Sequence, residues 1–113
     1  MRDRAAVERA CARLSLAAPE EGEAKIYSAT KTGLLVRLQD WEFPVCCDLA
    51  TGRVEYDNYG GYWGDPKRLD AFLQAYTVEK ATLEARRKGC SVLEQALADG
   101  SIKLVIGVAA EGR

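Results

Sequence analysis

Residues 65–89, DPKRLDAFLQAYTVEKATLEARRKG, predict one long helix that divides the chain into a longer first part and a short second part. Asp65 is a typical N-cap, and Pro66 suits the first helical position. Gly89 follows three consecutive cations, a pattern typical of a helix C-terminus. We therefore expect a helix from residue 66 to about residue 88. Its apolar side, expected to pack across a sheet, consists of Leu69, Phe72, Leu73, Tyr76 and Leu83.

The residues before this helix show the alternation of apolar and polar side chains that is typical of short strands. Turn-like residues interrupt the alternation several times, which favours an antiparallel meander. We expect four strands, at residues 25–29, 34–38, 43–49 and 53–58, with turns at 30–33, 40–42 and 50–52.

Each end of the chain predicts one further element. Asp3 can cap a helix that ends near Leu16 and carries an apolar stripe at helical spacing. Asp99-Gly100, between strand-like residues 91–96 and 102–108, predicts a hairpin, with a helix over 93–98 as the competing interpretation. The expected fold is therefore one α+β domain over residues 1–113: an N-terminal helix, a four-stranded antiparallel meander, a long helix packed on the sheet and a C-terminal β-hairpin.

Composition excludes several classes of function. The chain has 113 residues, 48% of them hydrophobic, which suits one folded domain. It contains no histidine, so Ser-His-Asp or Cys-His catalysis and His-ligated zinc are excluded within it. A net charge of −1 argues against a nucleic-acid partner, because phosphate binding needs clustered cations. No cofactor is indicated.

The four cysteines favour a structural role. Cys46 and Cys47 are adjacent, whereas Cys11 and Cys90 are remote, so the spacing argues against a metal site. On a strand, Cys46 and Cys47 would point to opposite faces. We expect reduced, mostly buried thiols, with a disulfide framework or a redox pair at Cys46-Cys47 as alternatives. The start has no secretory signal, and no segment is long enough to span a membrane, so a cytoplasmic location without membrane association is expected.

A glycine–aromatic segment precedes the long helix and is the densest unusual cluster in the chain. Aromatic rings on a glycine-rich backbone can stack on a ligand or on a partner's side chains. The alternative is a loop that folds its own rings over the sheet or the helix. The candidate binding residues are Tyr56, Tyr59, Gly60, Gly61, Tyr62 and Trp63.

Two other functions stay open on the residues alone. An enzyme could use Asp48 and Asp57 with the Tyr56 hydroxyl, if pairing of the third and fourth strands brought the carboxylates together. The alternative for these aspartates is turn capping at solvated strand ends. A weak binder of single-stranded nucleic acid could stack bases on Tyr59, Tyr62 and Trp63.

The last 60 to 70 residues also carry a family resemblance. The segments concerned are VCCDL at 45–49, YWG at 62–64, LDAFLQAY at 69–76, KGC at 88–90 and DGSIKLV at 99–105. In this pattern the chain resembles the uncharacterised family known as hypothetical chloroplast open reading frame 35. The resemblance implies a small accessory protein with a protein partner, such as an adaptor for an AAA-type ATPase.

The chain departs from that family in two places. The family usually opens with a short strand bearing serine and histidine, whereas here residues 1–3 lead almost directly into the first helix. The family's long helix often carries a Tyr-x-Tyr-His run, whereas Tyr76 is followed here by Thr-Val-Glu. A role that depends on that histidine therefore cannot be transferred to this chain.

Overall fold

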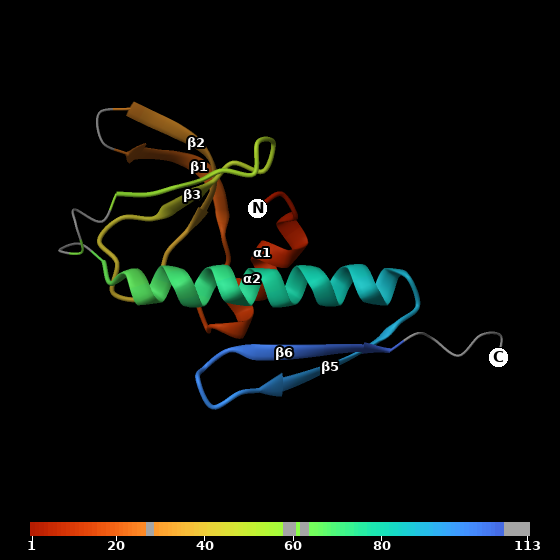
Figure 1. Cartoon of the computed structure of the whole chain (residues 1–113). Coiled ribbons are helices and arrows are strands. Elements are labelled where there is room, and N and C mark those ends of the chain that lie inside the picture. The colour runs from red at the N-terminus through yellow and green to blue at the C-terminus, as the bar shows by residue number, and fades with distance from the viewer. Residues whose placement is uncertain (27–28, 58–60, 62–63, 108–113) are drawn as a thin grey trace.

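A computed structural model describes residues 1–26, 29–57, 61 and 64–107 (Figure 1). The fold is α+β, with an N-terminal helix, a four-stranded antiparallel sheet, a long helix and a closing hairpin, as the sequence predicts. The long helix α2 lies between the sheet and the hairpin (Figure 1). The elements are α1 (Arg4–Arg13), β1 (Glu20–Ile26), β2 (Ala29–Val36), β3 (Val45–Cys47), β4 (Val54–Glu55), α2 (Pro66–Arg87), β5 (Ser91–Ala96) and β6 (Ile102–Gly107).

Both helices begin where their capping residues predict. The Asp3 carboxylate accepts a hydrogen bond from Ala6 N at 3.2 Å, and that of Asp65 accepts one from Lys67 N at 2.9 Å. These bonds satisfy backbone donors that the first helical turn leaves free. After α2, Gly89 takes a φ of 78°, in the left-handed region that glycine adopts at little cost.

The sheet has the strand order β1-β2-β3-β4. The predicted turn at residues 30–33 is wrong, because these residues form part of β2 and pair with β1. Gly33, the reason for predicting that turn, instead allows close approach of two strands. A Cβ built at Gly33 would lie 2.6 Å from the carbonyl oxygen of Cys47 on β3. This glycine therefore serves backbone packing rather than a change of chain direction.

The two faces of the sheet are buried in different clusters. Cys47 points into the main core, which α1 and α2 cover, whereas Cys46 packs on the opposite face with Ala24 and Ile26. This arrangement confirms the expected divergence of the two thiols. The main core consists of Ala6, Val7, Ala10, Cys11, Leu34, Val36, Leu38, Val45, Cys47, Leu69, Phe72, Ala75 and Tyr76.

The prediction for the apolar side of α2 is wrong at one residue. Leu69, Phe72 and Tyr76 are buried in the main core, and Leu83 packs against it, but Leu73 is exposed. The buried side of the helix also includes Ala75, Val78 and Thr82, so its centre lies away from Leu73. The helix considered as the alternative for residues 93–98 is also wrong, because Ser91–Ala96 is a strand.

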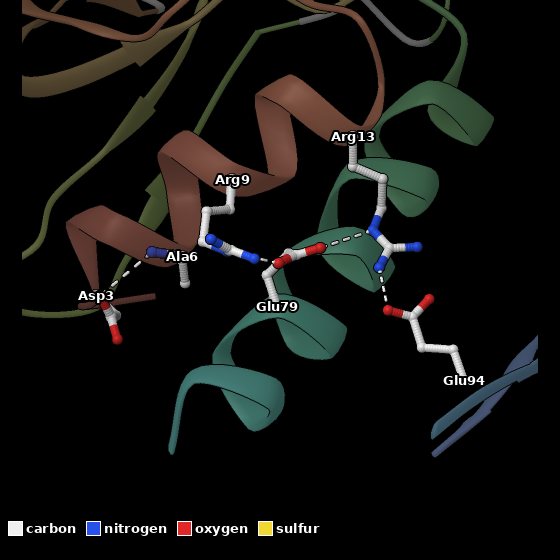
Figure 2. A network of polar contacts seen from close by, with 6 residues as sticks. All are labelled: Asp3, Ala6, Arg9, Arg13, Glu79 and Glu94. Carbon is white, nitrogen blue, oxygen red and sulfur yellow. Dashed lines mark hydrogen bonds and ion pairs between the residues drawn. The ribbon is translucent and has the colours of Figure 1, made fainter. Parts of the chain in front are cut away.

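An ionic network centred on the buried Glu79 joins α1, α2 and β5 (Figure 2). Glu79 of α2 accepts hydrogen bonds from the Nε atoms of Arg9 and Arg13, each at 2.9 Å. Arg13 also donates to Glu94 of β5 at 2.6 Å. The Glu79 side chain is only 9% exposed, so its charge is stable there because two guanidinium groups contact it. The network thereby connects the hairpin to both helices.

Candidate functional site

An aromatic group forms at the end of the sheet from which the chain enters α2. Trp41 and Tyr56 meet edge to face, with ring centroids 5.7 Å apart and an interplanar angle of 65°. This is a favoured arrangement for aromatic pairs. The β3–β4 register places the residues before β3 beside those after β4, so Phe43 lies at the same end of the sheet. We call Trp41, Phe43 and Tyr56 the aromatic patch.

The start of α2 supports the aromatic patch. Trp41 Nε1 donates a hydrogen bond to the backbone oxygen of Asp65 at 3.0 Å. A Cβ built at Gly64 would overlap the indole, 2.6 Å from its Cγ atom. Trp41 therefore stacks directly on the backbone at Gly64, and no larger residue fits there. Because both the ring and the nitrogen of the Trp41 indole are in contact with the start of α2, the orientation of this side chain in the patch is fixed.

The patch presents apolar surface to solvent. Phe43 is 43% exposed and Tyr56 is 36% exposed, whereas Trp41 is half-buried. Acidic residues adjoin the patch in the chain, since Asp40 and Glu42 flank Trp41 and both are exposed. Asp40 forms a long ion pair with Arg68 of α2, at 3.8 Å. The patch thus combines an aromatic surface with neighbouring side chains that are mostly acidic.

Only part of the predicted glycine–aromatic site can be placed. Tyr56 lies in the aromatic patch, and Gly61 has a φ of 103°, which favours glycine. Tyr59, Gly60, Tyr62 and Trp63 lie outside the described residues, so their predicted role stays a prediction.

Sequence reasoning missed Trp41 and Phe43 as members of a site. The sequence pattern predicts a turn at residues 40–42 and a strand at 43–49, but β3 begins only at Val45. Two aromatic residues close to Pro44 and just before a short strand could have indicated a surface group. The strand register was also needed, because it brings this segment beside Tyr56.

One carboxylate of the alternative enzyme site has another role. Asp48 Oδ1 accepts hydrogen bonds from Ala50 N at 3.0 Å and from Thr51 N at 3.3 Å. The bond from the Thr51 backbone, with that from Ala50, lowers the pKa of the exposed Asp48 carboxyl. Asp48 is therefore a charged turn cap at neutral pH. Within the described residues, no group of three or more Cys, Asp or Glu side chains is placed to hold a metal ion.

The cysteines are free thiols, and three of them are buried. Burial raises the pKa of Cys47 to about 12 and that of Cys11 to about 11. Burial is also the main cause that raises the pKa of Cys46. Since the thiolate is the reactive form, these environments suppress nucleophilic and redox chemistry. The geometry agrees with the expected structural role and not with a disulfide framework.

Comparison with protein-family models, with curated proteins and with solved structures finds no match to this chain. Among the described residues, no helix has both the length and the apolar character needed to cross a bilayer. The fold and the described site define a small α+β domain whose most distinctive surface feature is the aromatic patch.

Proposed function

We propose that this chain is a non-enzymatic accessory protein of the cytoplasm that binds a protein partner through the aromatic patch. The observation that carries this proposal is the exposed Tyr56 ring against the fixed Trp41 indole, with the exposed Phe43 ring at the same end of the sheet. Aromatic side chains dominate the energetics of protein interfaces, and rings that are already held in place lose little entropy on binding.

The charges around the patch support a protein partner over a nucleic acid. Asp40 and Glu42 would repel a phosphate backbone, whereas they would attract lysine or arginine at the rim of a protein interface. The partner surface that fits is therefore an apolar or proline-containing segment flanked by cations. The family resemblance adds the proposal that this segment belongs to a larger machine, such as an AAA-type ATPase.

The arrangement of Asp48 favours binding over acid–base catalysis. A general acid or base needs a carboxyl group that can reach the substrate and whose pKa lies near the working pH. Asp48 instead holds its own turn, with a lowered pKa.

Affinity capture from the native cell tests this function. The Phe43→Ala/Tyr56→Ala variant removes the two exposed rings but keeps the Trp41 indole. Leu73→Ala is the matched control, because Leu73 is as exposed as Tyr56 and lies on α2. Loss of an interface anchor typically weakens binding roughly thirtyfold or more. We expect a partner that is captured by the wild type and by Leu73→Ala but lost from the double variant. Identical captured proteins for all three chains would refute the proposed surface.

A further inference from the structure

The C-terminal hairpin forms a separate sheet of its own. Its order is β5-β6, and within the described residues no third strand joins it. It contacts α2 on one side and turns its other face to solvent (Figure 1). Two-stranded sheets are marginally stable in water, and an open apolar edge is a site for pairing with another chain.

The outward face of the hairpin is apolar at its centre. Leu93 of β5 lies directly opposite Val105 of β6, so the two side chains share one face. They are 64% and 43% exposed. The neighbouring pair, Val92 and Ile106, points to the other face, where Val92 is half-buried while Ile106 is 50% exposed.

The turn determines which backbone groups of β6 point away from β5. Leu97 N donates to Ser101 O at 2.9 Å. Leu97 N and Ser101 O therefore point toward the facing strand, and inward and outward positions alternate along an antiparallel ladder. By this alternation Val105 bonds to β5, whereas the backbone groups of Leu104 and Ile106 point outward. Among the described residues, no third strand pairs with these outward groups.

The sequence of β6 favours the β6 edge, rather than the β5 edge, as the site of pairing with another chain. Residues 102–107, IKLVIG, contain no proline and a single charge, at Lys103. Native edges are usually protected by proline, by a bulge or by several charges. The β5 edge carries Glu94, whose carboxylate is bound to Arg13 at 2.6 Å. Pairing at β5 would bring a second chain next to this ion pair, which joins the hairpin to α1.

We propose that two copies of this chain associate by antiparallel pairing of their β6 strands about a two-fold axis at Val105. In this register the outward backbone groups of Leu104 bond to those of Ile106 in the second copy. The side chains of Leu93 and Val105 from both copies form one apolar row across a four-stranded sheet. Lys103 lies opposite Gly107 of the second copy, so the two lysines do not face each other. This proposal does not depend on the aromatic patch.

The size of the surface sets the expected strength of the dimer. One six-residue strand edge with a few exposed apolar side chains is a smaller surface than the ~800 Å² per partner of a standard stable interface. We therefore expect a reversible dimer that forms at micromolar or higher concentrations. The pairing is closed by its two-fold symmetry, so it ends at the dimer and does not extend into filaments.

Disulfide trapping tests the register. Val105→Cys is made in a Cys90→Ser background, which removes the only native thiol that is not buried among the four. At a non-hydrogen-bonded antiparallel pair the two Cα atoms lie about 4.5 Å apart, within disulfide range. Leu93→Cys in the same background is the matched control, because Leu93 shares the face and is more exposed. We expect covalent dimers to form roughly tenfold or more faster with Val105→Cys, because pairing raises its effective concentration.

Sedimentation of the unoxidised chain tests the association itself. The wild type should shift from monomer toward dimer as its concentration rises. Ile106→Pro should stay monomeric, because proline removes an outward donor without breaking a β5–β6 bond. Far-UV circular dichroism checks that this variant is folded. A wild type that stays monomeric at all concentrations overturns the proposal. The β6 edge would then be open for pairing with a strand of a different protein. Equal trapping at Leu93, or open-ended oligomers, also overturns it.

Discussion

Replacing Glu79 with glutamine tests the ionic network that joins three elements of the fold. The Glu79 carboxylate accepts one hydrogen bond from Arg9 and one from Arg13. An amide has only one oxygen, so a glutamine side chain at this position keeps a single acceptor, and its remaining hydrogen bond no longer involves two charges. Charge-assisted hydrogen bonds contribute about 1.5–3 kcal/mol each, so we expect the free energy of unfolding to fall by about 2 kcal/mol at neutral pH.

The pH dependence separates this effect from a general loss of packing. Burial raises the pKa of Glu79, but the hydrogen bonds from Arg9 and Arg13 outweigh it, and the pKa lies below its usual 4.5. A lowered folded-state pKa means that Glu79 stabilises the fold above the unfolded-state value. That contribution is lost as pH falls from about 5 through the folded-state pKa. The difference between wild type and Glu79→Gln should therefore shrink in acid.

Urea denaturation between pH 7 and pH 3 measures both effects. Glu84→Gln is the matched control, because Glu84 lies on the same helix and forms an exposed ion pair with Lys80. Exposed pairs contribute little, so we expect no measurable change for this variant. A Glu79→Gln chain as stable as the wild type at pH 7, or a difference that stays constant with pH, would refute the role assigned to the network.

Two further substitutions and one labelling reaction test other parts of the fold. Gly33→Ala should lower the free energy of unfolding by about 2 kcal/mol or more in urea titrations, because its Cβ would meet the Cys47 carbonyl; an unchanged midpoint would contradict the close approach of β2 and β3. Gly64→Ala should displace the Trp41 indole and shift the tryptophan fluorescence, and it should cost about 1–3 kcal/mol. An unchanged spectrum would show that the indole does not stack there. Thiol labelling of the native protein should modify Cys90 first and Cys47 only on unfolding, since burial raises the pKa of the latter thiol to about 12; rapid labelling of Cys47 would contradict its burial.

The elements that the sequence predicts best are those marked by local chemistry. Asp65, Pro66 and Gly89 specify both ends of α2, and Asp99-Gly100 specifies the hairpin. Each of these residues acts on the backbone within a few positions of itself, so its effect can be read without knowing the rest of the fold.

The parts that could not be predicted depend on contacts between distant residues. Glycine is a common turn residue, so Gly33 suggests a turn in the sequence. Only the position of Cys47 on β3 shows why glycine is needed here inside a strand. Leu73 fits the apolar pattern of α2, but it is exposed because the buried face is centred on the other side of Phe72, towards Ala75 and Val78. Glu79 gives no sign of burial until Arg9 and Arg13 are placed beside it.

The candidate site shows the same limit. Tyr56 could be selected because aromatic residues cluster around it in the sequence. Trp41 and Phe43 could not, since only the pairing of β3 with β4 brings them to the same end of the sheet as Tyr56. The support that Gly64 and Asp65 give to the indole likewise depends on tertiary structure.

Photo-cross-linking from position 56 in the native cell tests the proposed binding surface most directly. A photoreactive aromatic amino acid replaces Tyr56 in one chain and the equally exposed Leu73 in the control. We predict a discrete protein adduct from position 56 that disappears when Phe43→Ala is added, and no such adduct from position 73. The absence of an adduct from position 56, or the same adduct from both positions, would contradict the assignment of the aromatic patch as a protein-binding surface.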